Sequence, residues 1–136
     1  QPLDILMVRD GTYLVGTCAI VTEYDTEIVY QSHIFKIRLT GKGSRLNPFL
    51  LLALLSCSFV KRQIKAKCFT QDIIDSLGDR VNELLLPIPR DESLRDQVTE
   101  MVKTSVYERV EAREIARKAR EAVLGLTNEN VASASA

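Results

Sequence analysis

The feature that most constrains this chain is a run of 32 residues, Ser93–Leu124, that contains neither glycine nor proline. The run is rich in Glu, Arg, Lys, Ala and Val, which favours a single helix. Asp91 or Ser93 can cap its start, and Gly125 can end it. At 1.5 Å per residue such a helix would be roughly 48 Å long.

One face of this predicted helix has the spacing of a coiled coil. Alternate steps of four and three residues from Leu94 to Leu126 select ten positions, and eight of them are apolar. The alanines in the second half would permit close approach of a partner helix. We therefore expect a helix interface that is buried only when a second helix is present. Its main residues are Leu94, Val98, Met101, Ala112, Ile115 and Ala119.

Length and patterning together predict one domain followed by an extension. Residues 1–90 are expected to form an α+β domain with a small mixed β-sheet and short helices. Residues 91–126 form the long helix, and the small polar residues 127–136 predict a disordered tail. Because the chain begins at Gln1 and enters a strand almost at once, we expect it to be a piece of a larger protein.

The first domain opens with two β-rich runs in Ile5–Val21, pinched around the polar sequence Arg9–Thr12. This pattern predicts a hairpin, whose charged tip is either an ordinary turn or a recognition loop. A half-buried strand is expected from Phe35 to Leu39, after an interruption at Gln31–His33. The sequence Asn82–Ile88 predicts a short last strand, closed by prolines.

Two adjacent helices are expected in the middle of the domain. Asn47 and Pro48 predict the start of an apolar helix that runs to Leu55. A second short helix, Phe59–Lys67, follows a break in which Ser58 could act as the cap. On that helix the apolar and basic residues fall on different faces, which predicts one buried side and one basic stripe.

Positive charge is concentrated on this second helix. The whole chain has 18 basic and 18 acidic residues, yet residues 47–69 contain no acid. Their four cations are Lys61, Arg62, Lys65 and Lys67. Such a patch could contact the phosphates of a nucleic acid. Composition alone favours the simpler interpretation that the patch only solubilises the domain.

The sequence offers little for catalysis. It has one histidine, His33, and three scattered cysteines, and it contains no phosphate-binding loop or spacing typical of a metal site. We therefore expect a non-catalytic protein with no cofactor and no bound metal. The acidic residues Asp72, Asp75 and Asp79 are interpreted as a solvated face. Cysteines without a pairing pattern favour a reducing compartment, and we expect a cytoplasmic protein.

Two short segments carry side chains that could read base edges in DNA. One supplies Arg9, Thr12 and Tyr13, and the other supplies Gln31, Ser32 and His33. For His33, a structural hydrogen bond at a strand bend is an equally good interpretation.

The order of four stretches resembles the target recognition domain of specificity subunits in type I restriction–modification systems. The related domains of fused restriction–methylation enzymes are similar. The first stretch, Asp4–Thr12, resembles the family's Gly-Asp-Ile-Leu, Arg and Gly-Ser/Thr strand and turn, and Gln31–Ile34 resembles its Ser-Gln-His strand start. Asn47–Ile64 resembles its Asn-Pro-x-Tyr-Leu helix pair, and Leu86–Pro89 resembles the Ile-Pro-Leu-Pro segment before its long helix.

This resemblance implies a module that directs methylation and cleavage by partner subunits. Its partners would be double-stranded DNA, methyltransferase subunits that use S-adenosylmethionine, and a restriction subunit. The long helix would pair with another helix, within the parent protein or by self-association. In this family the first part of the domain would precede Gln1. The rival hypothesis is an α/β protein-interaction module that assembles through the helix and does not contact DNA.

Overall fold

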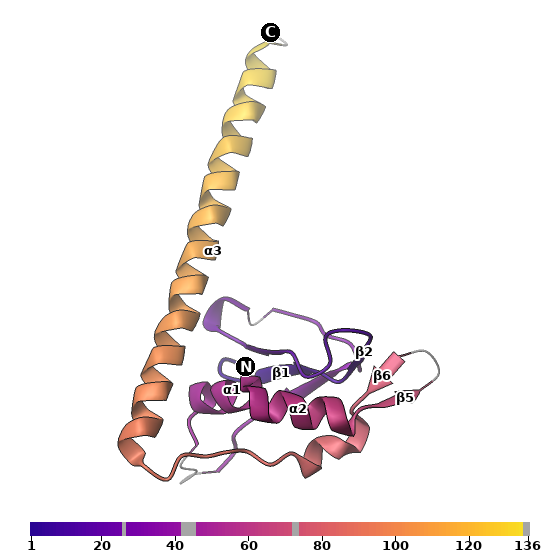
Figure 1. Cartoon of the computed structure of the whole chain (residues 1–136). Coiled ribbons are helices and arrows are strands. Elements are labelled where there is room, and N and C mark those ends of the chain that lie inside the picture. Colours follow the sequence, from indigo (N-terminus) through magenta and orange to yellow (C-terminus); the bar gives the residue numbers. More distant parts are fainter. Residues whose placement is uncertain (26, 42–45, 72–73, 135–136) are drawn as a thin grey trace. The chain divides into compact units, whose positions relative to one another are not determined.

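The computed structural model describes residues 1–25, 27–41, 46–71 and 74–134, with side chains for all of these except 71 and 126–134. Figure 1 shows two small antiparallel sheets, short helices and one long helix, so the predicted α+β class is confirmed. The fold divides into one unit of residues 1–102 and a second of residues 103–136, and each is described by itself.

The first sheet contains β1 (Ile5–Val8), β3 (Cys18–Ile20) and β4 (Ile34–Ile37), in the order β3-β1-β4. Both pairings of β1 are antiparallel, with Met7 opposite Cys18 on one side and Phe35 on the other. Ile5 and Met7 point to the same side of the strand and are fully buried. The predicted hairpin within Ile5–Val21 is therefore present.

The second sheet changes the interpretation of the hairpin tip. It contains β2 (Asp10–Gly11), β6 (Ile74–Ser76) and β5 (Phe69–Gln71), in the order β2-β6-β5. Asp10 pairs with Ser76 and Gly11 with Asp75, so the middle of the segment Arg9–Thr12, predicted as a turn, is instead a strand. The prediction was wrong because the pairing partner lies more than sixty residues away, where local patterning carries no signal. The actual loop of the hairpin spans residues 12–17.

The two helices are close to their predicted positions. Helix α1 (Pro48–Ser56) is capped by Asn47, whose side-chain oxygen accepts a hydrogen bond of 2.9 Å from the Phe49 amide. Helix α2 (Ser58–Lys67) begins after an extended residue, Cys57. Cys57 is the cap residue, and Ser58 is already helical, so the predicted capping role of Ser58 is not observed. Because Cys57 is the single residue between the two helices, Cys57 takes the cap position and Ser58 is the first helical residue.

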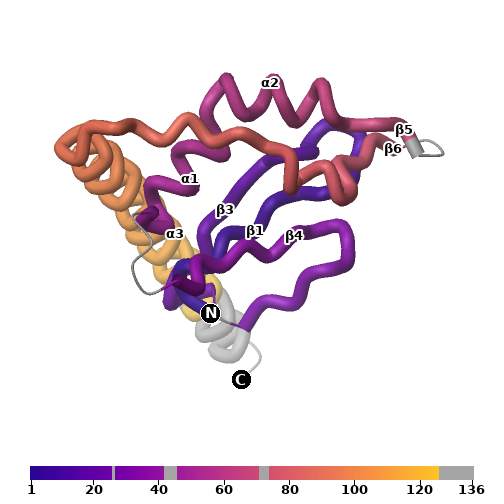
Figure 2. Tube along the Cα trace, turned by 90° about the horizontal axis from the view of Figure 1, so that it is seen from below, coloured from indigo at the N-terminus to yellow at the C-terminus, as the bar shows by residue number. Residues whose placement is uncertain are grey.

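Figure 2 shows helices α1 and α2 beside the first sheet, and the core of the first unit lies between β1 and these two helices. Alternate residues of β1 meet the inward faces of α1 and α2. The cluster consists of Ile5, Met7, Leu51, Leu55, Val60, Ile64 and Leu77. Burial of Val60 and Ile64 on one face confirms the predicted division of α2, and it orients the remaining faces toward solvent.

The segment predicted as a last strand has a different structure. Residues 78–83 form a 3-10 helix, η2 (Gly78–Glu83), and residues 84–89 are irregular. The Gln63 side chain bonds both backbone groups of Leu85, donating to its carbonyl at 2.8 Å and accepting from its amide at 2.9 Å. A side-chain amide thus replaces a strand partner, which the alternating apolar pattern does not reveal.

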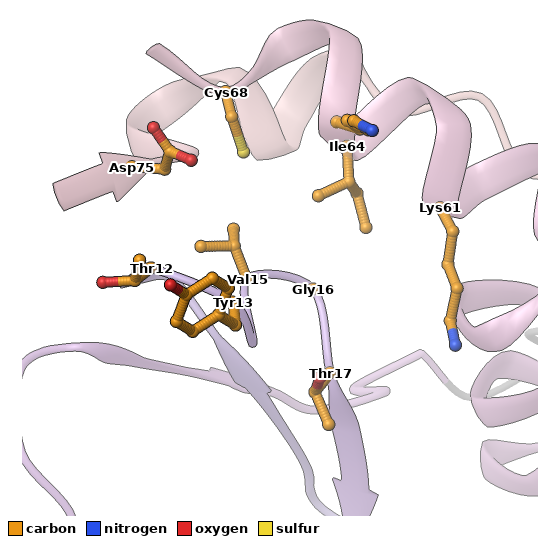
Figure 3. A pocket seen from close by; sticks show the side chains of 10 residues that line it. Thr12, Tyr13, Val15, Gly16, Thr17, Lys61, Ile64, Cys68 and Asp75 are labelled. Carbon is orange, nitrogen blue, oxygen red and sulfur yellow. The ribbon is translucent and has the colours of Figure 1, made fainter. Parts of the chain in front are cut away.

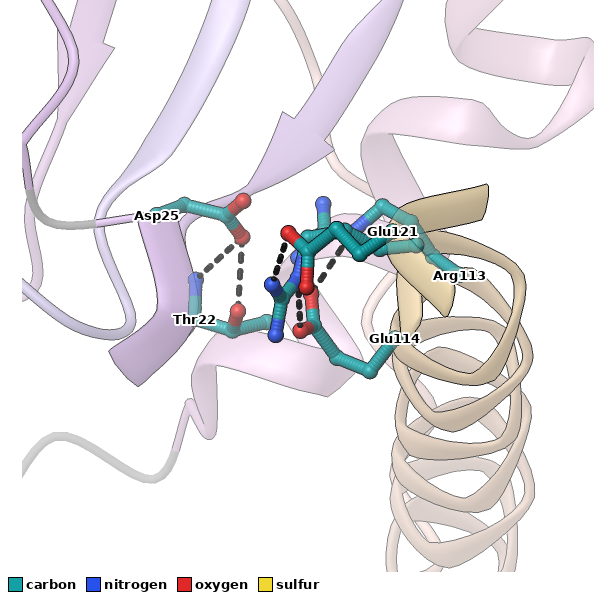
Figure 4. Close-up of polar contacts among 6 residues, drawn as sticks. Thr22, Asp25, Arg113, Glu114 and Glu121 are labelled. Atoms are coloured by element: carbon teal, nitrogen blue, oxygen red, sulfur yellow. Dashed lines mark hydrogen bonds and ion pairs between the residues drawn. The ribbon is translucent and has the colours of Figure 1, made fainter. Parts of the chain in front are cut away.

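A second 3-10 helix, η1 (Glu23–Asp25), follows β3. The Asp25 carboxylate accepts hydrogen bonds from the Thr22 hydroxyl at 2.6 Å and from the Thr22 amide at 3.3 Å (Figure 4). This closed turn agrees with the polar composition of the segment.

The long helix α3 (Glu92–Ala134) starts where Asp91 accepts a hydrogen bond of 3.0 Å from the Ser93 amide. It passes Gly125, the predicted end, and includes most of residues 127–136, which were predicted to be disordered. One glycine costs a helix only about 1 kcal/mol, and no proline follows it. Residues 135 and 136 of that predicted tail lie outside the described residues.

Within the second unit, the side chains of α3 make ion pairs along the helix. Arg117 donates to Glu114 at 2.9 Å and to Glu121 at 2.7 Å (Figure 4). These residues are three and four positions apart, the spacing that brings helical side chains together. None of the helices in the described ranges is both long and apolar enough to cross a membrane.

An ion pair between a buried carboxylate and an exposed guanidinium joins the residue before β1 to the residue after β4. The Asp4 side chain is 3% exposed, and the Arg38 guanidinium donates two hydrogen bonds of 2.6 Å to it. These bonds, opposed by burial, hold the pKa of Asp4 well below its ordinary value. Arg38 itself is exposed, and its guanidinium reaches Asp4 because an unpaired buried carboxylate would be costly.

Gly16 should be intolerant of a side chain. Its φ is +80°, and a Cβ there would lie 2.7 Å from Cδ1 of buried Ile64. We expect Gly16→Ala to lower the free energy of unfolding by about 1–3 kcal/mol, measured by urea denaturation. Gly125→Ala is the control and should cause no loss, because open space surrounds that position. An unchanged midpoint for Gly16→Ala would contradict the predicted clash.

The Asp4–Arg38 pair should make stability depend on pH. A lowered pKa in the folded state adds stability above the unfolded value of about 3.9, and this gain is lost as pH falls. We expect Arg38→Gln to lower the free energy of unfolding at pH 7, because it leaves the buried Asp4 carboxylate without its main hydrogen-bond donor. Its difference from the unmodified chain should narrow below roughly pH 4. Lys36→Gln, on the same strand, removes the same charge and should have little effect at either pH.

Candidate nucleic-acid interface

A pocket of about 410 Å³ lies between the loop 12–17 and helix α2 (Figure 3). The loop supplies Thr12, Tyr13, Val15 and Thr17 on one side. On the other side Ile64 and Cys68 face Val15 across the space, as Figure 3 shows. The pocket therefore joins two segments that are about fifty residues apart in the sequence.

Gly16 allows this approach. Its amide donates a hydrogen bond of 2.9 Å to the Val8 carbonyl, and its bare Cα faces the side chain of Ile64. Because Ile64 is anchored in the core, the loop is held at a fixed distance from α2. Tyr13, which lines the pocket, is 92% exposed. The loop thus presents an aromatic ring and hydroxyl groups on a supported backbone.

The opposite wall of the pocket is basic. Lys61 and Lys65 are one helical turn apart on α2, and both line the pocket. Arg62 is exposed on the same helix but does not line the pocket. Asp75 of β6 is the acidic residue at the edge, where it accepts a hydrogen bond of 3.0 Å from Thr70. Two ammonium groups beside hydroxyls and an apolar floor are suited to a phosphate with its attached sugar.

The thiols near the pocket are not activated. Burial raises the pKa of Cys18 to about 11, although Lys61 opposes the shift. Burial, and then the charge of Asp75, raise the pKa of Cys68. Both thiols therefore stay protonated at neutral pH, and protonated thiols are poor nucleophiles.

A second polar group surrounds the buried carboxylate of Asp10, which is 5% exposed. Its Oδ2 atom accepts a hydrogen bond of 2.8 Å from Nε of Arg9 and lies 3.0 Å from Nδ1 of His33. Its Oδ1 atom accepts a hydrogen bond from the Ser76 hydroxyl. We call these four residues the Asp10 cluster. Because Ser76 donates to Asp10 and not to His33, the cluster does not activate a serine nucleophile.

The hydrogen bonds of the cluster determine the charge of Asp10. Burial raises its pKa, but the bonds from Ser76, His33 and Arg9 outweigh burial and leave the pKa below its ordinary value. Asp10 is therefore ionised at neutral pH.

The Asp10 cluster and the pocket are neighbours along β2. Asp10 pairs with Ser76 of the cluster, and the next residue, Gly11, pairs with Asp75 of the pocket. Thr12, which lines the pocket, is two residues from Asp10, or about 7 Å along an extended chain. The predicted base-reading segment and the predicted phosphate-binding helix thus lie at one region of the first unit.

Besides Arg62, three of the predicted DNA-binding residues belong neither to the pocket nor to the Asp10 cluster. Lys67 forms an ion pair of 2.6 Å with Glu83 of η2, so its charge is largely compensated. Gln31 and Ser32 are exposed in the turn before β4, but among the described residues neither lines the pocket. The sequence predicted Lys67 as part of the basic stripe, but Lys67 is the last residue of α2, where it pairs with Glu83 of η2.

Sequence reasoning missed Asp10, Ser76, Thr17 and Val15 as parts of the site. Asp10 was noticed only as part of the supposed turn, and Ser76 carried no signal at all. Their association depends on the pairing of β2 with β6. Thr17 and Val15 follow Tyr13 in the loop, and the correct loop boundary would have included them.

Comparisons with protein-family models, with curated proteins and with solved structures find no match to this chain. The fold and the site define an α+β domain with a basic-walled pocket, an ion-paired polar cluster beside it, and a long helix.

Proposed function

We propose that this chain is a sequence-specific DNA-binding module of a restriction–modification system, which directs methylation and cleavage by partner subunits. The observation that carries the proposal is the pocket where Thr12 and Tyr13 meet Lys61 and Lys65. The Asp10 cluster, with its partly exposed Arg9 and His33, adjoins it. One surface thus offers cations for phosphates and side chains with the donors and acceptors that base edges require.

The two kinds of residue divide the work of binding. Lys61, Arg62 and Lys65 contact phosphates, which gives affinity and register without reading sequence. Arg9, Thr12 and Tyr13 influence the choice of sequence. The module itself has no catalytic role and needs no cofactor. Methyltransferase subunits supply the S-adenosylmethionine chemistry in the cytoplasm, and a restriction subunit supplies cleavage. The resemblance of the four sequence stretches supports this assignment.

The long helix provides the second part of the proposal. Met101 is 72% exposed and Ile115 is 60% exposed, although both belong to the apolar seam. Leu94 is also exposed, and Val98 is half-buried. The small seam residues Ala112 and Ala119 are exposed as well. Exposed apolar residues at this spacing favour pairing with another helix.

The basic residues of α2 can be tested by removing them together. We expect Lys61→Ala, Arg62→Ala and Lys65→Ala combined to weaken binding to all duplex DNA. The slope of log affinity against log salt should become shallower by about 2–3, because each phosphate contact contributes about 0.9. Fluorescence anisotropy over a salt series measures both quantities.

The control for this triple variant removes three exposed cations of α3, Arg109, Lys118 and Arg120. It has the same net charge and should keep most of the salt dependence. If both triple variants lose the same slope, net charge alone explains the binding. If the α2 variant binds like the unmodified chain, the basic stripe is only a solvated face.

The seam should drive self-association of the isolated chain. We expect Met101→Gln with Ile115→Gln to shift the chain toward monomer, because polar side chains replace the apolar contacts between helices. Sedimentation equilibrium over a concentration series measures the change. Lys118→Gln with Arg120→Gln, off the seam, is the matched control and should leave association unchanged. A monomeric unmodified chain with an intact helix at high concentration would contradict this role.

The exposed seam also favours the second candidate, a protein-interaction module without DNA contact. A gel-shift assay at low salt distinguishes the two functions. Retarded duplex DNA that responds to the α2 substitutions supports the first function. Absence of any retardation, with self-association retained, supports the second.

A further inference from the structure

The Asp10 cluster determines which nitrogen of His33 carries the proton. An ionised carboxylate has only acceptor oxygens, so Nδ1 of His33, 3.0 Å from Oδ2, must donate. In a neutral imidazole one nitrogen is a donor and the other is an acceptor. In the neutral ring Nε2, which lies across from Nδ1, is therefore the acceptor. The His33 side chain is 52% exposed, so this acceptor is accessible to a ligand.

The same carboxylate oxygen fixes Arg9. Oδ2 of Asp10 accepts a hydrogen bond of 2.8 Å from Nε of Arg9, the guanidinium nitrogen nearest the main chain. The Arg9 guanidinium also lies 5.9 Å from the centre of the Phe35 ring on β4. Among the described residues, no side chain bonds the two terminal nitrogens of Arg9. The Arg9 guanidinium and the His33 ring therefore contact the same carboxylate oxygen, and the two terminal nitrogens of Arg9 keep their N–H donors for a ligand.

Backbone contacts make this arrangement rigid. The Arg9 amide donates to the His33 carbonyl at 2.8 Å, and the Leu77 amide donates to the Arg9 carbonyl at 3.1 Å. Arg9 is thereby bonded on both sides of its backbone, to the residue before β4 and to the residue after β6. The two side chains are held by the sheets and do not depend on a free loop.

We propose that Arg9 and His33, positioned by Asp10, read one G·C base pair in the major groove. This inference rests on the proposed DNA-binding function. In that groove guanine presents two acceptors, N7 and O6, and the paired cytosine presents one donor, its N4 amino group. Two donors on Arg9 and one acceptor on His33 form the complementary set. An A·T pair alternates acceptor, donor and acceptor, and it cannot satisfy both Arg9 donors side by side.

The proton position can be tested without DNA. Since the chain has one histidine, the imidazole nitrogens in a ¹⁵N NMR spectrum of the neutral ring belong to His33 alone. We expect a protonated Nδ1 and an unprotonated Nε2. In Asp10→Asn, whose amide is a weaker acceptor and can also donate, the protonation preference should change. A proton on Nε2 in the unmodified chain would overturn the inference.

The base-pair assignment is tested by selection from duplex DNA with a randomised central region. The unmodified chain should select a motif with a G·C pair at a position where Asp10→Asn reduces discrimination by about tenfold. Arg9→Ala should relax the same position. Glu83→Gln is the control, since it removes an ion-paired carboxylate outside the cluster and should leave the motif unchanged.

The outcomes separate this inference from the function on which it rests. If the unmodified chain selects no motif and binds no duplex, the proposed function fails and the base-pair assignment fails with it. If a motif is selected but Asp10→Asn and Arg9→Ala relax no common G·C position, the DNA-binding function stands and this inference is overturned. Circular dichroism of each variant confirms that the fold is retained.

Discussion

The close contact between Gly16 and Ile64 is the constraint on which the candidate site depends. A residue with any side chain at position 16 would collide with a core isoleucine of α2. The bare glycine lets the loop 12–17 approach the helix, and the core fixes the helix through Val60 and Ile64. The pocket, its basic wall and the exposed Tyr13 follow from that approach.

Asp10 has a corresponding role for the polar side chains beside the pocket. Placing a carboxylate at 5% exposure is unfavourable unless several donors compensate it. Here three segments each supply one donor, and these donors are Arg9, His33 and Ser76. The contacts that compensate the burial of Asp10 thus also orient Arg9 and His33, whose side chains remain accessible to a ligand. In this account the core positions the phosphate-binding helix, and a buried charge positions the base-reading groups.

The sequence predicted the elements whose signals are local. The Asn47 cap, the two faces of α2, the β1–β3 hairpin and the start of α3 all depend on neighbouring residues. The second sheet was missed because β2 and β6 are short and pair over a long separation. The supposed strand at Asn82–Ile88 was wrong because the Gln63 side chain takes its backbone bonds. The candidate site was therefore half visible: its cations and loop could be named, but the carboxylate that organises Arg9 and His33 could not.

The central claim is that duplex DNA contacts the surface formed by the loop 12–17, α2 and the Asp10 cluster. The most direct measurement is an amide chemical-shift map of the chain during titration with duplex DNA at moderate salt. We expect the largest changes at Thr12–Thr17, Lys61–Lys65 and His33. No changes at saturating DNA, or changes confined to residues 103–125, would contradict the account.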